Sequence, residues 1–168
     1  MEKITFEPVK NEIQIKELAQ LAKPIWEQHF TPIIGKAQVE YMVSMFQSVP
    51  ALTKQINEGY EYYRFFVENQ PIGYTGIHEE EGKLFLSKLY IKKEYRGKHF
   101  SSKALDFLTA LAKERKLSAI LLTVNKHNDN TISIYKHMGF VVTKEQKADI
   151  GNGFFMDDYI MELSIGVK

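Results

Sequence analysis

The segment "LYIKKEYRGKHFSSKAL", residues 89–105, passes from a strand-like pattern through a short basic stretch into a helical pattern. A helix start carries backbone N–H groups without intrahelical partners and the positive end of the helix dipole. A turn that leads into such a helix can therefore wrap an anion, above all a phosphate. Residues 92 to 103 hold five Lys or Arg and one acid, Glu94. The segment is consistent with an anion site, and an ordinary surface loop with solvated lysines is the alternative.

Two common phosphate motifs are absent from this segment. A nucleoside triphosphatase loop needs G-x-x-x-x-G-K-S/T, but Lys92 stands where the first Gly would fall and His99 follows Lys98. The dinucleotide pattern G-x-G-x-x-G does not occur either. Gly97 would still let the backbone approach a ligand or adopt a positive φ.

Composition excludes several classes of function. The 168 residues are 44% hydrophobic and carry 22 Lys or Arg against 21 Asp or Glu, a balance that argues against coating DNA or an anionic membrane. Without cysteine, the chain has no disulfide, thiolate nucleophile or Cys-ligated metal. None of its five His shows a metal-binding spacing. With neither a signal peptide nor an apolar run of about 20 residues, we expect a soluble, cytoplasmic protein.

Hydrophobic periodicity predicts a single domain over residues 1–168. The expected order is strand, two helices, three strands, helix, strand, helix and two strands. We expect the strands at 4–9, 62–69, 72–80, 83–93, 119–125, 140–146 and 154–163, and the helices at 11–30, 36–58 (divided by Pro50), 101–115 and 129–138. A mixed, mostly antiparallel α/β sheet with helices on both faces accommodates this order.

A second segment, "NDNTISIYKHMGF" (128–140), combines helix caps with an aromatic residue. Asn128 and Asp129 are good N-caps, and Gly139 suits the end of a helix. Taken alone, the segment would make Tyr135 a half-buried core aromatic.

Together, "LYIKKEYRGKHFSSKAL" and "NDNTISIYKHMGF" resemble the two sequence blocks of the GNAT superfamily of acyl-CoA N-acyltransferases. The likeness extends over the element order from residue 4 to residue 163. It implies a central sheet splayed between the fourth and fifth strands, and the transfer of an acetyl group from acetyl-CoA to a primary amine without a metal. "WEQHF" and "FMDDYIMEL" look most like bacterial enzymes that acetylate small amines such as polyamines; a peptide N-terminus or lysine is the other acceptor class considered.

The resemblance also implies roles for individual residues. Backbone groups of Leu89 and Ile91 would contact the pantetheine arm, and Asn128 would bond to the pantetheine or its amide. Tyr135 would sit near the sulfur and act as the general acid. The diphosphate of coenzyme A would be wrapped, mostly by N–H groups, by Arg96, Gly97, Lys98, His99, Phe100, Ser101 and Ser102.

Some positions depart from the family pattern. His99 and Ser101 stand at the positions where the family usually has Gly and then Gly or Ala. These side chains would weaken the binding of coenzyme A, and the alternative function is therefore a non-catalytic acyl-CoA sensor or interaction module. Thr131 replaces a usual Ala.

The sequence does not identify the general base. Ser87 stands where related enzymes often carry a Glu, which leaves His78, Glu79 or a water chain from Ser87 as alternatives. Asp157 and Asp158 are expected on opposite faces of the last strand. Trp26 would be a core residue or line an acceptor pocket with Glu27 and His29.

As partners we expect an amine acceptor, no nucleic acid and no membrane. A homodimer through the last strand is possible.

Overall fold

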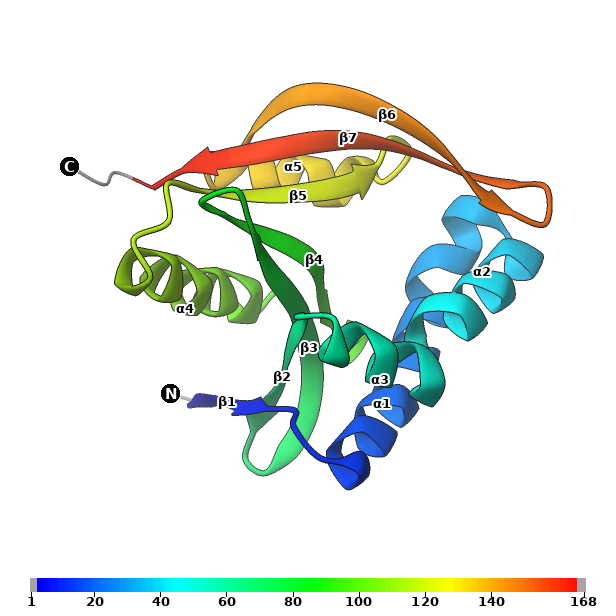
Figure 1. The fold of residues 1–168 in the computed structure, drawn as a ribbon, viewed down its shortest axis with the longest axis horizontal. Helices are drawn as coiled ribbons and strands as arrows, with labels where there is room; N and C mark the ends of the chain where they lie inside the picture. Colours follow the sequence, from blue (N-terminus) through cyan, green and yellow to red (C-terminus); the bar gives the residue numbers. More distant parts are fainter. Residues whose placement is uncertain (1–2, 166–168) are drawn as a thin grey trace. The chain divides into compact units, whose positions relative to one another are not determined.

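A computed structural model describes residues 3–165 (Figure 1). Within them, seven strands form a sheet in the order β1-β2-β3-β4-β5-β7-β6. Strands β4 and β5 run parallel, whereas β1–β2, β2–β3, β5–β7 and β6–β7 are antiparallel. The strands are β1 (Ile4–Pro8), β2 (Glu61–Val67), β3 (Gln70–Glu80), β4 (Lys83–Ile91), β5 (Ala119–Asn125), β6 (Val141–Gly151) and β7 (Phe154–Ser164). The predicted mixed, mostly antiparallel sheet is confirmed, and the parallel β4–β5 pair fits a splay at this position.

Five α-helices accompany these strands in the described part of the chain. They are α1 (Glu12–Ile34), α2 (Lys36–Met42), α3 (Val49–Asn57), α4 (Phe100–Glu114) and α5 (Asp129–His137). A π-helical turn, Val43–Gln47, follows α2, and a 3₁₀ turn, Lys93–Tyr95, follows β4. Over residues 3–165, no helix combines the length and the apolar character that crossing a bilayer requires.

The structure divides into two compact units, and the chain passes between them within β3, β4 and α4. The first unit contains the chain up to His78 together with Lys88–Lys103, and the second contains Glu79–Ser87 and the chain from Ala104 onward. The single domain over residues 1–168 stays a prediction.

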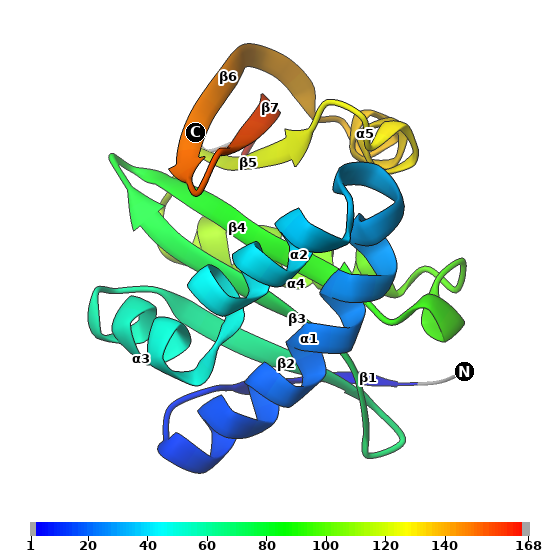
Figure 2. The same ribbon diagram turned by 90° about the vertical axis from the view of Figure 1, so that its right-hand side faces the viewer.

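In the first unit, α1 and strands β2 and β3 supply most of the buried apolar side chains. Figure 2 shows α1 lying across these strands. Helix α1 begins with a capping box, in which the Asn11 side chain accepts from the Gln14 N–H and the Gln14 side chain accepts from the Asn11 N–H. Such a box satisfies two of the orphan donors at a helix start. The buried residues of α1 recur every three or four positions: Ile15, Leu18, Leu21, Ala22, Ile25, Trp26 and Phe30.

Close contact between strands β3 and β4 depends on a glycine. A Cβ atom added to Gly73 would stand 2.2 Å from the carbonyl oxygen of Tyr90. That separation is far below a van der Waals contact, so any side chain at residue 73 would push this part of β4 away.

In the second unit, β7 pairs with β5 on one side and with β6 on the other. The β5–β7 ladder runs from Ala119–Ser164 to Asn125–Asp158. Residues Leu84–Leu86 of β4 pair in parallel with Ile120–Leu122 of β5. Strand β6 stands last in the strand order, so at this end of the sheet the edge is β6, and β7 is paired on both sides. A homodimer stays a prediction.

Most predicted boundaries agree with the structure to within two residues, with three clear exceptions. Helix α1 continues to Ile34, beyond the predicted end at residue 30. The division of the 36–58 region occurs at Ser48, which caps α3, because Pro50 stands in the first turn of α3, where its missing N–H costs nothing. Strand β6 continues to Gly151, beyond the predicted end at residue 146. Its side chains are almost all exposed, so the strand lacks the apolar alternation that marks a half-buried strand.

Candidate active site

The loop after β4 is anchored to the end of its own strand. The Arg96 guanidinium Nε donates to the Ile91 carbonyl oxygen over 3.0 Å. The Arg96 N–H donates to the Lys93 carbonyl, which closes the 3₁₀ turn. Ile91 is 5% exposed, and Leu89 is partly exposed. The loop therefore leaves the strand in a fixed direction.

Two residues of this loop have left-handed backbone conformations. Gly97 has φ +76°, and His99 has φ +65°. A non-glycine residue pays roughly 1–2 kcal/mol for this conformation. His99 stands where the family pattern usually has Gly, so the loop holds a glycine-like conformation without a glycine at residue 99.

Helix α4 opens directly after His99. The Lys103 N–H donates to the His99 carbonyl over 3.1 Å, and this bond starts the helical ladder. The amides of Phe100, Ser101 and Ser102 precede it, so they are the orphan donors of the helix start. The Phe100 side chain is 3% exposed, which leaves only its amide for a ligand. The loop thus combines basic side chains with a donor-rich helix end.

Charge around the loop is positive, and the Arg96 and Lys98 side chains are exposed. The Lys98 and Lys103 ammonium groups stand 5.8 Å and 5.6 Å from the ring centroids of Tyr95 and Phe100. Burial lowers the pKa of Arg96, with a smaller opposing effect from the Glu94 charge. Burial and the Arg96 charge lower the pKa of His29 in α1 to about 4, so this imidazole is neutral at pH 7.

The other two predicted site residues belong to the second unit. Asn128 is 7% exposed and precedes α5, but its side chain makes no cap hydrogen bond to the helix, contrary to the cap prediction. Tyr135 is 9% exposed, and its ring centroid lies 5.3 Å from that of Phe140. Burial raises the pKa of the Tyr135 hydroxyl well above its ordinary value. A hydroxyl of this kind stays protonated at neutral pH and can donate its proton.

The structure thus gathers Leu89, Ile91 and residues 96–102 in the first unit, and Asn128 and Tyr135 in the second. The ligand roles of all these residues stay predictions.

Strand β4 contains a buried lysine that the sequence pattern did not lead us to expect. Lys88 is 8% exposed, and its ammonium group donates to the Tyr62 hydroxyl and, over 3.0 Å, to Gln55 Oε1. The Tyr62 hydroxyl also bonds to Gln55. Burial lowers the pKa of Lys88 to about 7. The feature of the sequence that could have indicated its burial is a lysine at an inward-facing position of a mostly apolar strand.

Trp26 is a core residue. It is 4% exposed, and its indole N–H donates to the Tyr74 hydroxyl over 2.7 Å. The Tyr74 hydroxyl in turn donates to Gln47 Oε1 over 2.7 Å. Of the candidate bases, Glu79 is half-exposed and forms an ion pair with Arg115 at 2.9 Å, and His78 packs edge-on against the Tyr60 ring. A carboxylate held in an ion pair with an arginine is a poor base.

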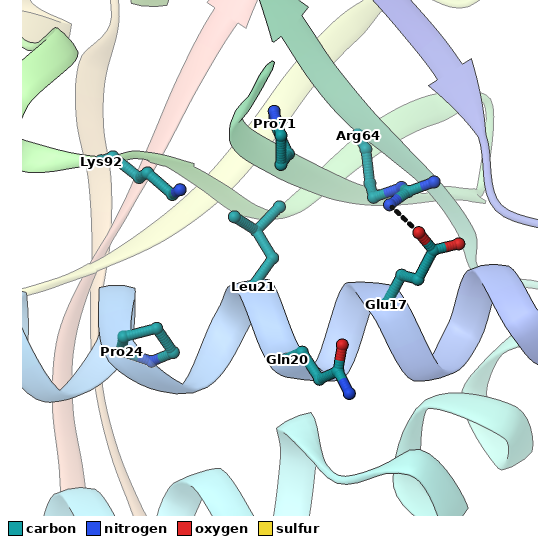
Figure 3. Close-up of a pocket in the computed structure, with 7 residues that line it drawn as sticks. All are labelled: Glu17, Gln20, Leu21, Pro24, Arg64, Pro71 and Lys92. Carbon is teal, nitrogen blue, oxygen red and sulfur yellow. Dashed lines mark ion pairs between the residues drawn. The ribbon is translucent and has the colours of Figure 1, made fainter. Parts of the chain in front are cut away.

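The first unit also has a surface pocket of about 250 Å³ beside α1 (Figure 3). Arg64 is 6% exposed and pairs with Glu17, at 3.5 Å, and with Glu7. The lining residues are Glu17, Gln20, Leu21, Pro24, Arg64, Pro71 and Lys92. None of the predicted site residues lines this pocket.

A model of the Acetyltransferase (GNAT) family matches residues 17–140, which is more than half of the chain. The chain belongs to the GNAT acetyltransferase family. It is therefore an acyltransferase, and its general chemistry is acetyl transfer.

Solved structures of other GNAT proteins share the fold. The paia N-acetyltransferase of Thermoplasma acidophilum, solved with coenzyme A, is 22% identical, with a TM-score of 0.78 over 96% of this chain and 99% of that one. The ribosomal-protein-S18-alanine N-acetyltransferase of Escherichia coli is 15% identical, with a TM-score of 0.69 over 100% and 96%. A streptothricin acetyltransferase of Bacillus anthracis, described as putative and solved with acetyl coenzyme A, is 17% identical, with a TM-score of 0.57 over 63% and 62%. At these identities the likeness concerns the fold.

The described residues of this GNAT protein contain no cluster of three or more His, Cys, Asp or Glu side chains that could hold a metal ion.

Proposed function

We propose that this GNAT acetyltransferase transfers an acetyl group from acetyl-CoA to a primary amine, which is a small amine such as a polyamine, or a peptide N-terminus or lysine. The observation that carries the proposal is the loop of residues 96–102. It joins left-handed backbone at Gly97 and His99 to the three orphan amides that open α4.

These features fit a diphosphate. Orphan amides and the helix dipole favour an anion, and Arg96 and Lys98 add two fixed positive charges. The left-handed backbone at His99 supports this proposal, because the loop holds a glycine-like conformation although residue 99 is not Gly. The complex of the Thermoplasma acidophilum protein with coenzyme A supports the same ligand class.

Tyr135 is the proposed general acid. Attack of the amine nitrogen on the thioester carbonyl forms a C–N bond, and the C–S bond then breaks with its electron pair on sulfur. The Tyr135 hydroxyl, kept protonated by burial, gives its proton to that sulfur and regains one from water. Because the thiol of the leaving group has a pKa of roughly 8.5, loss of this acid should slow turnover without abolishing it.

The reaction also requires stabilisation of the oxyanion and deprotonation of the amine. A backbone N–H in the stretch from Leu89 to Ile91 would stabilise the negative charge on the carbonyl oxygen. An alkylamine with a pKa near 10.4 is neutral in only about one molecule in a few thousand at pH 7, so a base that accepts its proton accelerates the reaction.

The test combines two measurements on the full chain. Calorimetric titration with acetyl-CoA should show 1:1 binding that weakens with salt, and a thiol-release assay over a panel of alkylamines, polyamines and peptides should show amine-dependent release of coenzyme A. Binding without release on any amine would support the acyl-CoA sensor instead. Absence of binding at millimolar acetyl-CoA would refute the proposal.

A further inference from the structure

Strand β6 is an open edge of the sheet in the second unit (Figure 1). Its neighbour β7 pairs with strands on both sides and buries Asp158, which is 4% exposed. Within residues 3–165, β6 pairs with β7 alone, and every residue from Val141 to Lys147 is exposed. The outward N–H and C=O groups of such an edge can pair with a strand of another chain.

Two register shifts limit the regular part of this edge. One lies between Val142 and Lys144, and the other between Asp149 and Gly151. Between these shifts, residues 144–149 pair one-to-one with residues 155–160 of β7. A further strand can therefore add to β6 in a regular antiparallel register only over this stretch, because a bulge bends a strand and interrupts its ladder.

The charge pattern of the regular stretch is complementary to itself. The stretch reads KEQKAD, residues 144–149, so Glu145 and Lys147 flank the neutral Gln146. By strand alternation these two charged side chains lie on the same face. Lysines on an edge strand usually discourage association with another chain. Here an acid stands two residues away from Lys147, so two antiparallel copies can bring opposite charges together.

Twofold symmetry restricts the possible registers. In a symmetric antiparallel pair of β6 strands, the residue on the axis stands opposite its own copy. Four of the six residues are charged, and an axis at any of them would place like charges opposite each other, which destabilises a strand pair. Gln146 and Ala148 remain. An axis at Ala148 would extend the pairing across the register shift between Asp149 and Gly151.

An axis at Gln146 keeps the pairing inside the regular stretch. Glu145 of each copy then faces Lys147 of the other copy, so the contact contains two cross-strand ion pairs. Lys144 of each copy faces Ala148, and the two Gln146 amides face each other. In this register no two like charges stand directly opposite each other.

The present surroundings of the two charged residues favour this contact. Glu145 and Asp157 share a single cation, Lys126, at 2.8 Å and 3.1 Å. The Lys147 ammonium group lies 5.2 Å from the ring centroid of Phe155 and forms no ion pair with a described residue. The cluster around Lys126 thus has one carboxylate more than cations, and Lys147 lacks a carboxylate. A second copy supplies what each of them lacks.

We propose that the β6 edge binds a second copy of this chain, which adds its residues 144–148 antiparallel across a twofold axis at Gln146 and so continues the sheet. Because so short a stretch makes a small contact, we expect a reversible dimer whose population rises with protein concentration. The surface lies outside the residues assigned to acetyl transfer, so this inference goes beyond the proposed function and does not depend on it.

Single cysteines test the register, because the chain has no cysteine of its own. On the axis, the Cα atoms of residue 146 would stand about 5 Å apart, within the reach of a disulfide. Residue 144 would stand about 13 Å along the strand from its copy. Under mild oxidation, Gln146→Cys should form the linked dimer at least about tenfold faster than the control Lys144→Cys. Equal rates, or faster linking by Ala148→Cys, would overturn the proposed register.

Sedimentation equilibrium of the full chain tests the ion pairs. The wild type should form dimers as its concentration rises toward millimolar. Glu145→Lys and Lys147→Glu each place like charges opposite each other, so the Kd of self-association of either variant should rise at least about tenfold. An equimolar mixture of these two variants should recover dimers, because each acid again faces a lysine. Lys144→Glu is the control and should keep the wild-type Kd.

Three outcomes would overturn the inference. The first is a wild type that stays monomeric at millimolar concentration. The second is a dimer that both charge variants leave intact, because the contact would then lie elsewhere. The third is a mixture that associates no better than the single variants. Since the Glu145 side chain is 64% exposed, loss of its pair with Lys126 should cost little stability. Thermal unfolding like that of the wild type shows that the variants are folded.

Discussion

Replacement of the buried Lys88 by Met should remove a pH dependence of stability that the wild type carries. Burial lowers the pKa of Lys88 from 10.5 to about 7. Because the folded pKa lies below the unfolded one, the penalty of charging this group is full below about pH 7 and disappears as the pH rises toward 10.5. At 1.36 kcal/mol per pH unit, the free energy of unfolding of the wild type should gain about 2.5 kcal/mol between pH 6 and pH 9 relative to Lys88→Met.

Urea unfolding at half-unit pH steps measures this difference. Taking the difference between the two proteins cancels the other titrating groups, and the bond between Tyr62 and Gln55 can persist in the variant. Lys54→Met is the matched control, because Lys54 is exposed on α3, and its stability curve should run parallel to that of the wild type. Parallel curves for the wild type and Lys88→Met would refute the reasoning, since they would mean that Lys88 keeps its charge and its hydration in the folded protein.

Three further predictions concern the site. Tyr135→Phe should lower kcat by more than about tenfold with little change in the Kd of acetyl-CoA measured by calorimetry; an unchanged rate would remove Tyr135 from the acid role. His99→Gly should raise the free energy of unfolding by up to about 1 kcal/mol, because the residue has φ +65°, and should leave the Kd within about threefold; a loss of stability in thermal unfolding would contradict this. Asp158→Asn should stabilise the fold at pH 8 by about 1–2 kcal/mol, a value below the full pKa shift because water retains some access to the group. The pKa of Asp158 is raised from 3.8 to about 6 in the folded protein, so the carboxyl group destabilises the fold only when it is ionised. The gain should therefore vanish near pH 4. Urea titration at both pH values checks this, and equal gains at pH 8 and pH 4 would argue against it.

Sequence periodicity predicted the elements that bury one clear face. Residues 119–125 form a near-continuous apolar run, and β5 has these bounds. The alternation of β7 correctly placed Asp157 and Asp158 on opposite faces. Strand β6 illustrates the limit, because its exposed polar residues pair with β7 through backbone bonds that have no side-chain signature.

Three features of the candidate site depend on tertiary packing and were not predictable from local pattern. The left-handed backbone of His99 follows from the turn between β4 and α4. The low pKa of Lys88 comes from its burial beside Tyr62, whose ring packs against Gly76, a contact between residues distant in sequence. The burial of Asp158 arises at the end of a ladder between β5 and β7. The sequence showed that a lysine and an aspartate occupied these strands, but not how much water each retains.

The account depends most on transfer of an acetyl group to an amine, and mass spectrometry of the acceptor after incubation with the full chain and acetyl-CoA tests this directly. The account predicts that one amine of the panel gains a single acetyl group on nitrogen, at a rate that matches thiol release and falls in Tyr135→Phe. Acetyl-CoA bound in the same sample, with every amine recovered unmodified, would contradict it.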